Sequence, residues 1–147
     1  MKAKICTIGF SKKSLRKFVE LLKQESVHTV IDTRLHNTSQ LSGYAKKDDL
    51  AFILEILGID YVHDSLLAPT EEILKAYKNK EITWEDYEKK YMDLLKRRKV
   101  EQYHKDLIGK KTVCLLCSEH TPHHCHRRLL AEYLQKFHSD VEIVHLM

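Results

Sequence analysis

The densest group of reactive side chains in the sequence lies in the segment 117–128, which reads CSEHTPHHCHRR. Thiols in such a segment can act as nucleophiles or bind metals, a carboxylate can act as a general base, and an arginine can hold a phosphate through two parallel hydrogen bonds. Five residues are our candidates for this chemistry: Cys117, Glu119, Cys125, His126 and Arg127. We predict that they form the main functional site.

Two of these candidates stand where a helix is expected to begin. Residues 126–137 carry apolar side chains at helical spacing, which places Cys125 and His126 at the helix N-terminus. The positive end of a helix dipole lowers the pKa of a thiol and attracts anions. Glu119 directly follows the preceding strand, so it could act as a general base or orient a histidine.

Zinc is an alternative ligand for the same segment, because cysteine and histidine are its usual partners in proteins. Cys117 and Cys125 could bind it together with one or two of the nearby histidines. The two cysteines are eight residues apart, however, and no second closely spaced pair exists, unlike in zinc-finger sequences. We therefore assign no metal ligands here.

Two other strand ends carry residues that could join this site. Gly9 permits a tight turn, and Ser11 could cap the next helix, whose N-terminal amide groups attract anions. The turn lacks the glycine pattern of nucleotide-binding loops, so a plain strand-to-helix turn is the other interpretation. Asp32 and Arg34 end an apolar strand and point the same way in an extended chain. They could form a local ion pair, or supply an acid or base and an anion clamp.

The elements that must position these residues alternate along the chain. Five apolar segments are expected to be strands: 4–8, 27–31, 59–63, 111–117 and 141–146. The fourth runs without alternation, as in a strand covered on both faces. Amphipathic helical segments separate the strands, and 65–107 has no strand signal. We therefore predict an α/β fold: three layers, with a mostly parallel sheet of about five strands, helices on both faces and a helical insertion before the fourth strand.

This fold would bring the candidate residues together. In open parallel sheets, ligands bind at the carboxyl ends of the strands, so the three segments converge if their strands are neighbours. The polar stretch 33–46 is long for a loop in a compact domain and is a candidate functional loop. The basic run 96–99 is expected to complement a helix C-terminus, with a phosphate-binding patch as its alternative.

Length and composition limit the number of domains, the kind of ligand and the cellular location that we expect. A length of 147 residues fits a single domain, 1–147, and the net charge of +4 is compatible with an anionic ligand without requiring one. The apolar runs are too short to span a bilayer, and no signal-peptide core follows the start, so we expect a cytoplasmic protein. A cytosol does not keep disulfides, so we expect free cysteines, with Cys6 and Cys114 in the core.

Motifs in three stretches together resemble the domain of unknown function 488 family. They are TIGFS at 7–11, IDTR at 31–34, and LLCSE at 115–119 followed by CHRRLLA at 125–131. The resemblance runs from residue 5 to residue 146, although typical members carry a histidine where this chain has Phe10. It implies an α/β fold and a site built from Gly9, Ser11, Asp32, Arg34, Cys117, Glu119, Cys125, His126 and Arg127. We expect the histidines outside the family motif, His120, His123 and His124, to be exposed loop residues.

The leading functional hypothesis is an enzyme that acts on a phosphate-bearing ligand, either a nucleotide or a nucleic acid. Arg34, Arg127 and the backbone near Ser11 would bind phosphate. Asp32 or Glu119 would act as general base in a hydrolytic or glycosidic cleavage.

Two alternatives stay open. One is a non-catalytic module that binds nucleic acid through the basic run 96–99 and the 117–128 segment. The other is thiol or metal chemistry at Cys117 and Cys125. The sequence points to no particular cofactor or oligomeric state, and we expect no membrane partner.

Overall fold

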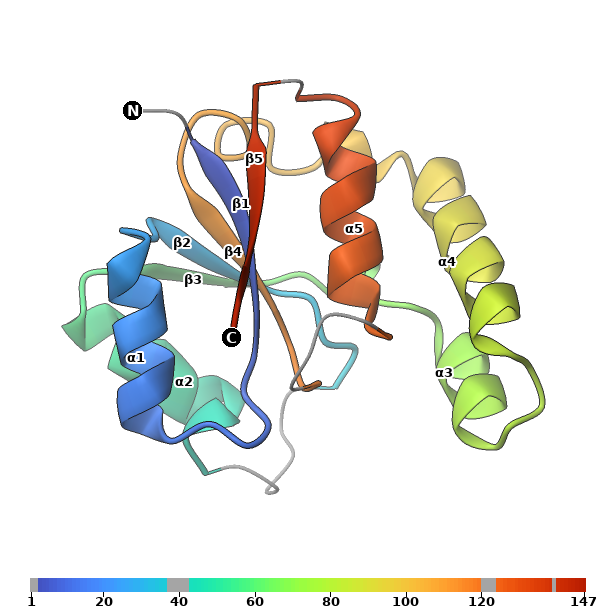
Figure 1. Ribbon diagram of the computed structural model, residues 1–147, viewed down its shortest axis with the longest axis horizontal. Coiled ribbons are helices and arrows are strands. Elements are labelled where there is room, and N and C mark those ends of the chain that lie inside the picture. The colour runs from blue at the N-terminus through green and yellow to red at the C-terminus, as the bar shows by residue number, and fades with distance from the viewer. Residues whose placement is uncertain (1–2, 37–42, 120–123, 139) are drawn as a thin grey trace.

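The computed structural model describes residues 3–36, 43–119, 124–138 and 140–147. Within these residues, five parallel strands form one sheet in the order β3-β2-β4-β1-β5 (Figure 1). The strands are β1 (Lys4–Gly9), β2 (Thr29–Asp32), β3 (Asp60–His63), β4 (Val113–Cys117) and β5 (Glu142–Leu146). The predicted α/β class and parallel sheet are confirmed.

Helices cover both faces of the sheet, as predicted (Figure 1). One face carries α1 (Leu15–Gln24) and α2 (Lys47–Ile56). The other carries α5 (His126–Gln135), with α4 (Trp84–Arg98) and α3 (Glu71–Lys78) packed beyond it. The helices α3 and α4 lie between β3 and β4 in the chain and form the expected insertion.

The unbroken apolar run of β4 follows from this layering. Val113 and Leu115 face the core beneath α5 and α4, whereas Cys114 and Leu116 face the core beneath α1 and α2. Each face of the strand is therefore buried, and no position is left for a polar residue. Cys114 lies fully buried in this core, as does Cys6 of β1, as predicted.

The ends of α1 and α2 show how local sequence sets the helices. Ser14 caps α1 by accepting a hydrogen bond from the backbone N–H of Lys17, so the prediction that Ser11 is the cap was wrong. The chain first makes an extra turn, in which Lys12 adopts a left-handed φ of 60°. Gly58 ends the α2 region with a φ of 73°, a conformation that glycine adopts without steric cost.

A local signal sets the start of α4, and a tertiary contact holds its end. The capping box of Thr83 and Asp86 opens it. At its C-terminus, Arg98 Nη1 donates to the carbonyl oxygens of Leu66 and Ala68, at 2.6 and 2.9 Å. This contact ties the basic end of α4 to the chain that leaves β3.

The strand order brings the candidate segments together. β4 lies between β1 and β2, so the carboxyl ends of the three strands that carry them are adjacent. In the described part of the chain, no helix is long and apolar enough to cross a membrane.

Candidate functional site

Backbone hydrogen bonds join the three segments where they leave the sheet. The N–H of Ser11 donates to the carbonyl oxygen of Ser118 at 3.1 Å, and the N–H of Thr33 donates to that of Leu116 at 3.0 Å. The carboxyl end of β4 and the residue that follows it are thus held between the chains that leave β2 and β1. The structure therefore places the predicted site residues at one edge of the sheet.

Gly9 is required here by a close approach of two backbones. A Cβ atom at this position would lie 1.5 Å from the carbonyl oxygen of Glu119 and 2.8 Å from Nη1 of Arg127. Every other amino acid would overlap the chain after β4. The absence of a side chain at Gly9 therefore allows Glu119 and Arg127 to lie against β1.

Asp32 and Arg34 form a buried ion pair. Arg34 Nε donates to Oδ1 of Asp32 at 2.9 Å, and Nη2 donates to Oδ2 at 2.7 Å. Tyr61 Oη donates to the same carboxylate at 2.6 Å. Asp32 is fully buried and Arg34 is 7% exposed, so the two charges neutralise each other inside the protein. Of the two interpretations left open by the sequence, the local ion pair is present, and a catalytic or clamping role stays a prediction.

Arg34 also contacts the chain after β1 and the chain before α2. Its guanidinium carbon lies 5.1 Å from the centre of the Phe10 ring, and its Nη2 donates to the carbonyl oxygen of Ala45 at 2.7 Å. The Nε and Nη2 donors of Arg34 are therefore used by protein atoms. We infer that Arg34 has a structural role: it holds together the chains that leave β1 and β2 and the chain before α2.

His126 fixes the start of α5 against the chain that leaves β2. Its Nε2 lies 2.9 Å from the carbonyl oxygen of Thr33, and since a carbonyl only accepts, Nε2 carries the proton. Burial lowers the pKa of His126 to about 4, so the ring is neutral at pH 7. His126 therefore orients α5 and adds no positive charge to the site.

The free energy of unfolding is expected to fall as the pH drops from about 6.5 to about 4 because of His126. The unfolded chain protonates this histidine near 6.5, whereas the folded chain holds it neutral until about 4, so unfolding takes up a proton in this window. The loss across the window is roughly 3 kcal/mol. Urea denaturation at several pH values should show this fall in the wild type and a smaller one in His126→Gln. Parallel curves for the two proteins would contradict the assignment.

Arg127 is fully buried below the carboxyl end of β1. Its Nη1 lies 2.8 Å from Cys117 Sγ and donates to the carbonyl oxygen of Glu119 at 2.7 Å. Burial lowers the pKa of Arg127 to about 10, which leaves it positively charged at neutral pH. Its direct contacts are thus with the protein, and it contributes charge beneath the surface of the site.

A second buried cation, Lys13, lies in the chain that follows β1 and was missed by the sequence analysis. Lys13 is 8% exposed, and burial together with the charge of Arg127 lowers its pKa. The sequence does contain a signal for Lys13: this lysine stands in the turn that follows Gly9, at the carboxyl edge of the sheet. Lys13 and Arg127 bring two positive charges to this edge.

Cys117 and Cys125 form a disulfide, so the prediction of free thiols is wrong at these two positions. The reason is tertiary: the chain returns after β4 so that the N-cap residue of α5 meets the last residue of that strand. Both sulfurs face Arg127 Nη1, which lies 3.5 Å from Cys125 Sγ. In the paired state neither sulfur is a thiolate, so a nucleophilic role for either cysteine would require reduction first.

The remaining predicted residues lie at the surface of this edge. Glu119 is exposed and directly follows β4, and Ser11 is half-buried beside it. His124 is exposed, as expected, but it also stacks on Trp84. Residues 37–42 of the candidate loop, together with His120 and His123, lie outside the described residues. Among the residues described, no three His, Cys, Asp or Glu side chains are grouped to hold a metal.

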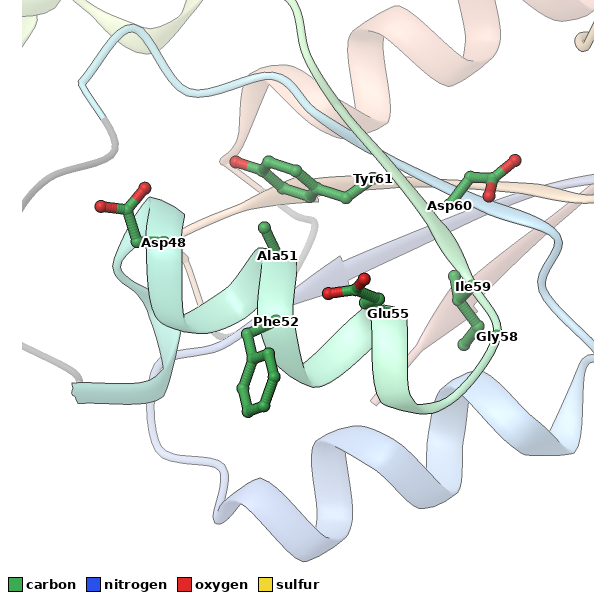
Figure 2. Close-up of a pocket in the computed structure, with 8 residues that line it drawn as sticks. All are labelled: Asp48, Ala51, Phe52, Glu55, Gly58, Ile59, Asp60 and Tyr61. Atoms are coloured by element: carbon green, nitrogen blue, oxygen red, sulfur yellow. The ribbon is translucent and has the colours of Figure 1, made fainter.

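A separate pocket of about 500 Å³ lies between α2 and the edge strand β3 (Figure 2). Its lining residues are Asp48, Ala51, Phe52, Glu55, Gly58, Ile59, Asp60 and Tyr61. None of the predicted site residues lines it. Tyr61 connects the two regions, because its hydroxyl bonds to Asp32.

The comparisons with known proteins agree with the motifs. A family model described as "Domain of unknown function DUF488" matches residues 14–134, which is most of the chain. The protein belongs to the DUF488 family. No curated protein and no solved structure matches the chain. In this DUF488 protein the matched range contains the site segments after β2 and β4, whereas Gly9 and Ser11 lie just before it.

Proposed function

We propose that this edge of the sheet binds a phosphate-bearing ligand, a nucleotide or a nucleic acid, and that the protein is an enzyme acting on it. The observation that carries the proposal is the pair of buried cations, Lys13 and Arg127, below the exit of β1. The N-terminus of α5 adds the positive end of its dipole at the same place. Together they give this edge a positive potential that favours an anion.

The ligand would lie on the exposed side of these cations. Arg34 is neutralised by Asp32, and Arg127 is buried, so phosphate oxygens would meet polar groups at the surface, such as Ser11 and Ser118. Buried charge acts strongly over short distances because the surrounding protein screens it less than water does. In this proposal Arg127 contributes through its charge and through the backbone that it holds.

Glu119 is the general base of the proposed reaction. Its side chain is exposed, while Arg127 fixes its backbone oxygen. A carboxylate placed beside bound phosphate can take a proton from a water that attacks either the phosphate or a glycosidic carbon. Asp32 suits this role less well, because it is buried and bonded to Arg34 and Tyr61.

Replacing Glu119 with glutamine is expected to lower kcat by at least about 100-fold while Kd changes by less than about threefold. The amide keeps the shape of the side chain but cannot take a proton. The measurement is turnover and affinity for the substrate found in a panel of nucleoside phosphates and short single-stranded oligonucleotides. Glu142→Gln, at the amino end of β5, is the matched control. Equal losses of kcat and affinity, or full activity of Glu119→Gln, would argue against the role.

The non-catalytic alternative relied on the basic run 96–99 acting together with the site. α4 contains 15 residues and is therefore about 22 Å long. Its N-terminus lies near the carboxyl ends of the strands and its C-terminus points toward their amino ends (Figure 1), although Arg98 reaches back to the chain that leaves β3. A nucleic acid that used both the basic run and the 117–128 segment would therefore have to extend along α4.

A further inference from the structure

The disulfide of Cys117 and Cys125 is part of the proposed phosphate site. Cys117 ends β4, and Cys125 is the N-cap residue of α5. Arg127 Nη1 lies 2.8 Å from the sulfur of Cys117 and 3.5 Å from that of Cys125. The same nitrogen donates to the carbonyl oxygen of Glu119 at 2.7 Å. One buried guanidinium therefore contacts both halves of the disulfide and the backbone of the proposed general base.

As a cross-link, this disulfide is weaker than one that closes a long loop. Its two cysteines are only eight residues apart. In the chain-entropy model, a disulfide stabilises a fold by restricting the unfolded chain, and this effect grows with the length of the closed loop. Backbone hydrogen bonds from Ser11 to Ser118 and from Thr33 to Leu116 also hold the end of β4. The end of β4 is therefore expected to stay in place when the disulfide is reduced.

Arg127 stabilises the reduced form of the pair. Buried thiols normally stay protonated: burial raises the pKa of Cys6 to about 12 and holds the pKa of Cys114 well above its ordinary value. Cys117 is similarly buried, but its sulfur touches a guanidinium, and a cation favours the thiolate strongly where little water screens it. A disulfide whose reduced form is stabilised in this way is more easily reduced.

We propose that Cys117 and Cys125 are a redox-sensitive pair that sets the charge of the phosphate site. This inference rests on the proposed function, because the quantity that changes is the affinity for phosphate. With the disulfide formed, Arg127 and Lys13 give the site two buried positive charges. With the disulfide reduced, the thiolate of Cys117 pairs with Arg127 and cancels one of them. The oxidised protein therefore binds a phosphate-bearing ligand more tightly than the reduced protein.

The reductant of this pair is a small thiol. Its thiolate attacks Cys125 Sγ, the S–S bond breaks, and the electron pair stays on Cys117 Sγ, which is the better leaving group because it lies closer to Arg127 Nη1. A second thiolate attacks the mixed disulfide and frees Cys125. The complete reaction converts the protein disulfide and two thiols into the Cys117 thiolate, the Cys125 thiol, the disulfide of the reductant and one proton.

Access to the pair requires only a small local movement. Both cysteines are buried, but the residues next to them in the chain, Ser118 and His124, are exposed. A small thiol that displaces one of these neighbours can therefore reach Cys125 Sγ.

The first measurement follows the thiolate in the absence of any ligand, by its ultraviolet absorbance. Dithiothreitol is expected to produce about one thiolate per wild-type molecule near neutral pH. Cys125→Ser, which leaves Cys117 without a disulfide partner, should show this thiolate with no reductant at all. The double variant Cys117→Ser/Cys125→Ser should show none, because Cys6 and Cys114 stay protonated in the core.

The second measurement is the affinity for adenosine 5′-monophosphate, by titration calorimetry. The oxidised wild type is expected to bind about tenfold more tightly than the reduced wild type, since one buried charge is lost. Cys125→Ser should bind like the reduced wild type and the double serine variant like the oxidised one, and neither should respond to dithiothreitol. Cys6→Ala is the matched control, a buried cysteine outside the site, and should respond to dithiothreitol like the wild type.

The outcomes separate this inference from the proposed function. A disulfide that resists dithiothreitol in the folded protein, or a reduced protein without a thiolate near neutral pH, would overturn the redox pair. Equal affinity of the oxidised and reduced proteins for the nucleotide would overturn the charge switch and leave the phosphate site standing. A thiolate that forms as expected, with no nucleotide binding in either state, would overturn the phosphate site and confirm the redox pair.

Discussion

Gly9→Ala is expected to lower the free energy of unfolding by about 3 kcal/mol. The added Cβ would lie 1.5 Å from the carbonyl oxygen of Glu119, and this neighbour is backbone, which cannot rotate away. Relief requires the chain after β4 to move away from β1. Urea denaturation monitored by circular dichroism measures the change.

The same movement should disturb the site. Glu119 and Arg127 are both held against Gly9, so the variant should also lose ligand affinity under conditions where it remains folded. Gly43→Ala is the matched control, because a Cβ at Gly43 meets nothing within 4 Å. If the two alanine variants unfold at the same urea concentration, the close packing at Gly9 is wrong.

Asp32→Asn is expected to cost about 3–5 kcal/mol of stability. The amide preserves the shape of Asp32 but leaves the positive charge of Arg34, which is 7% exposed, without its counter-charge inside the protein. Removing one partner of a buried ion pair is costly because the other charge stays out of water. Thermal and urea denaturation at neutral pH measure the loss.

A surface ion pair provides the control for this prediction. Arg97 and Asp93 pair on α4 with both side chains about two-thirds exposed, at 69% and 66%. Asp93→Asn should cost at most about 1 kcal/mol, since water screens exposed charges. In addition, Arg34→Met introduced into Asp32→Asn should recover part of the lost stability, because the buried charge is then removed. Equal effects of the two asparagine variants, or no recovery in the double variant, would contradict the account.

Much of the fold could be predicted because it follows from local patterns. The unbroken run of β4, Val113–Cys117, indicated a strand buried on both faces, and such strands imply a parallel sheet covered on each side. The capping box of Thr83 and Asp86, which opens α4, and the left-handed Gly58, which follows α2, are equally local signals. These signals act over a few residues, so the sequence alone reveals them.

Features that depend on the tertiary arrangement could not be predicted in this way. The position of β4 between β1 and β2 is not encoded in any local pattern, although it is what joins the candidate segments. Tyr61 reaches Asp32 only because β3 pairs with β2 in a particular register. The disulfide of Cys117 and Cys125 likewise depends on how the chain returns after β4.

In the candidate site, too, some features could be predicted from the sequence and others depend on the tertiary arrangement. Its location followed from the rule that ligands bind where parallel strands end, and the predicted residues do gather there. Their contacts were not predictable: Arg34 is engaged by Asp32, and Arg127 is buried against Cys117. The stacking of His124 on Trp84 joins residues that are 40 positions apart, which no spacing rule reveals.

The central claim, that a phosphate-bearing ligand binds where β1 and β4 end, is tested most directly by NMR. Titration of the ¹⁵N-labelled protein with adenosine 5′-monophosphate would show which backbone amides change their chemical shifts. We predict that the largest changes fall at 10–14, 118–119 and 124–128, and that they weaken as salt is added, since charge drives the binding. Changes centred on 48–61, on the basic run 96–99, or nowhere in the protein would contradict the account.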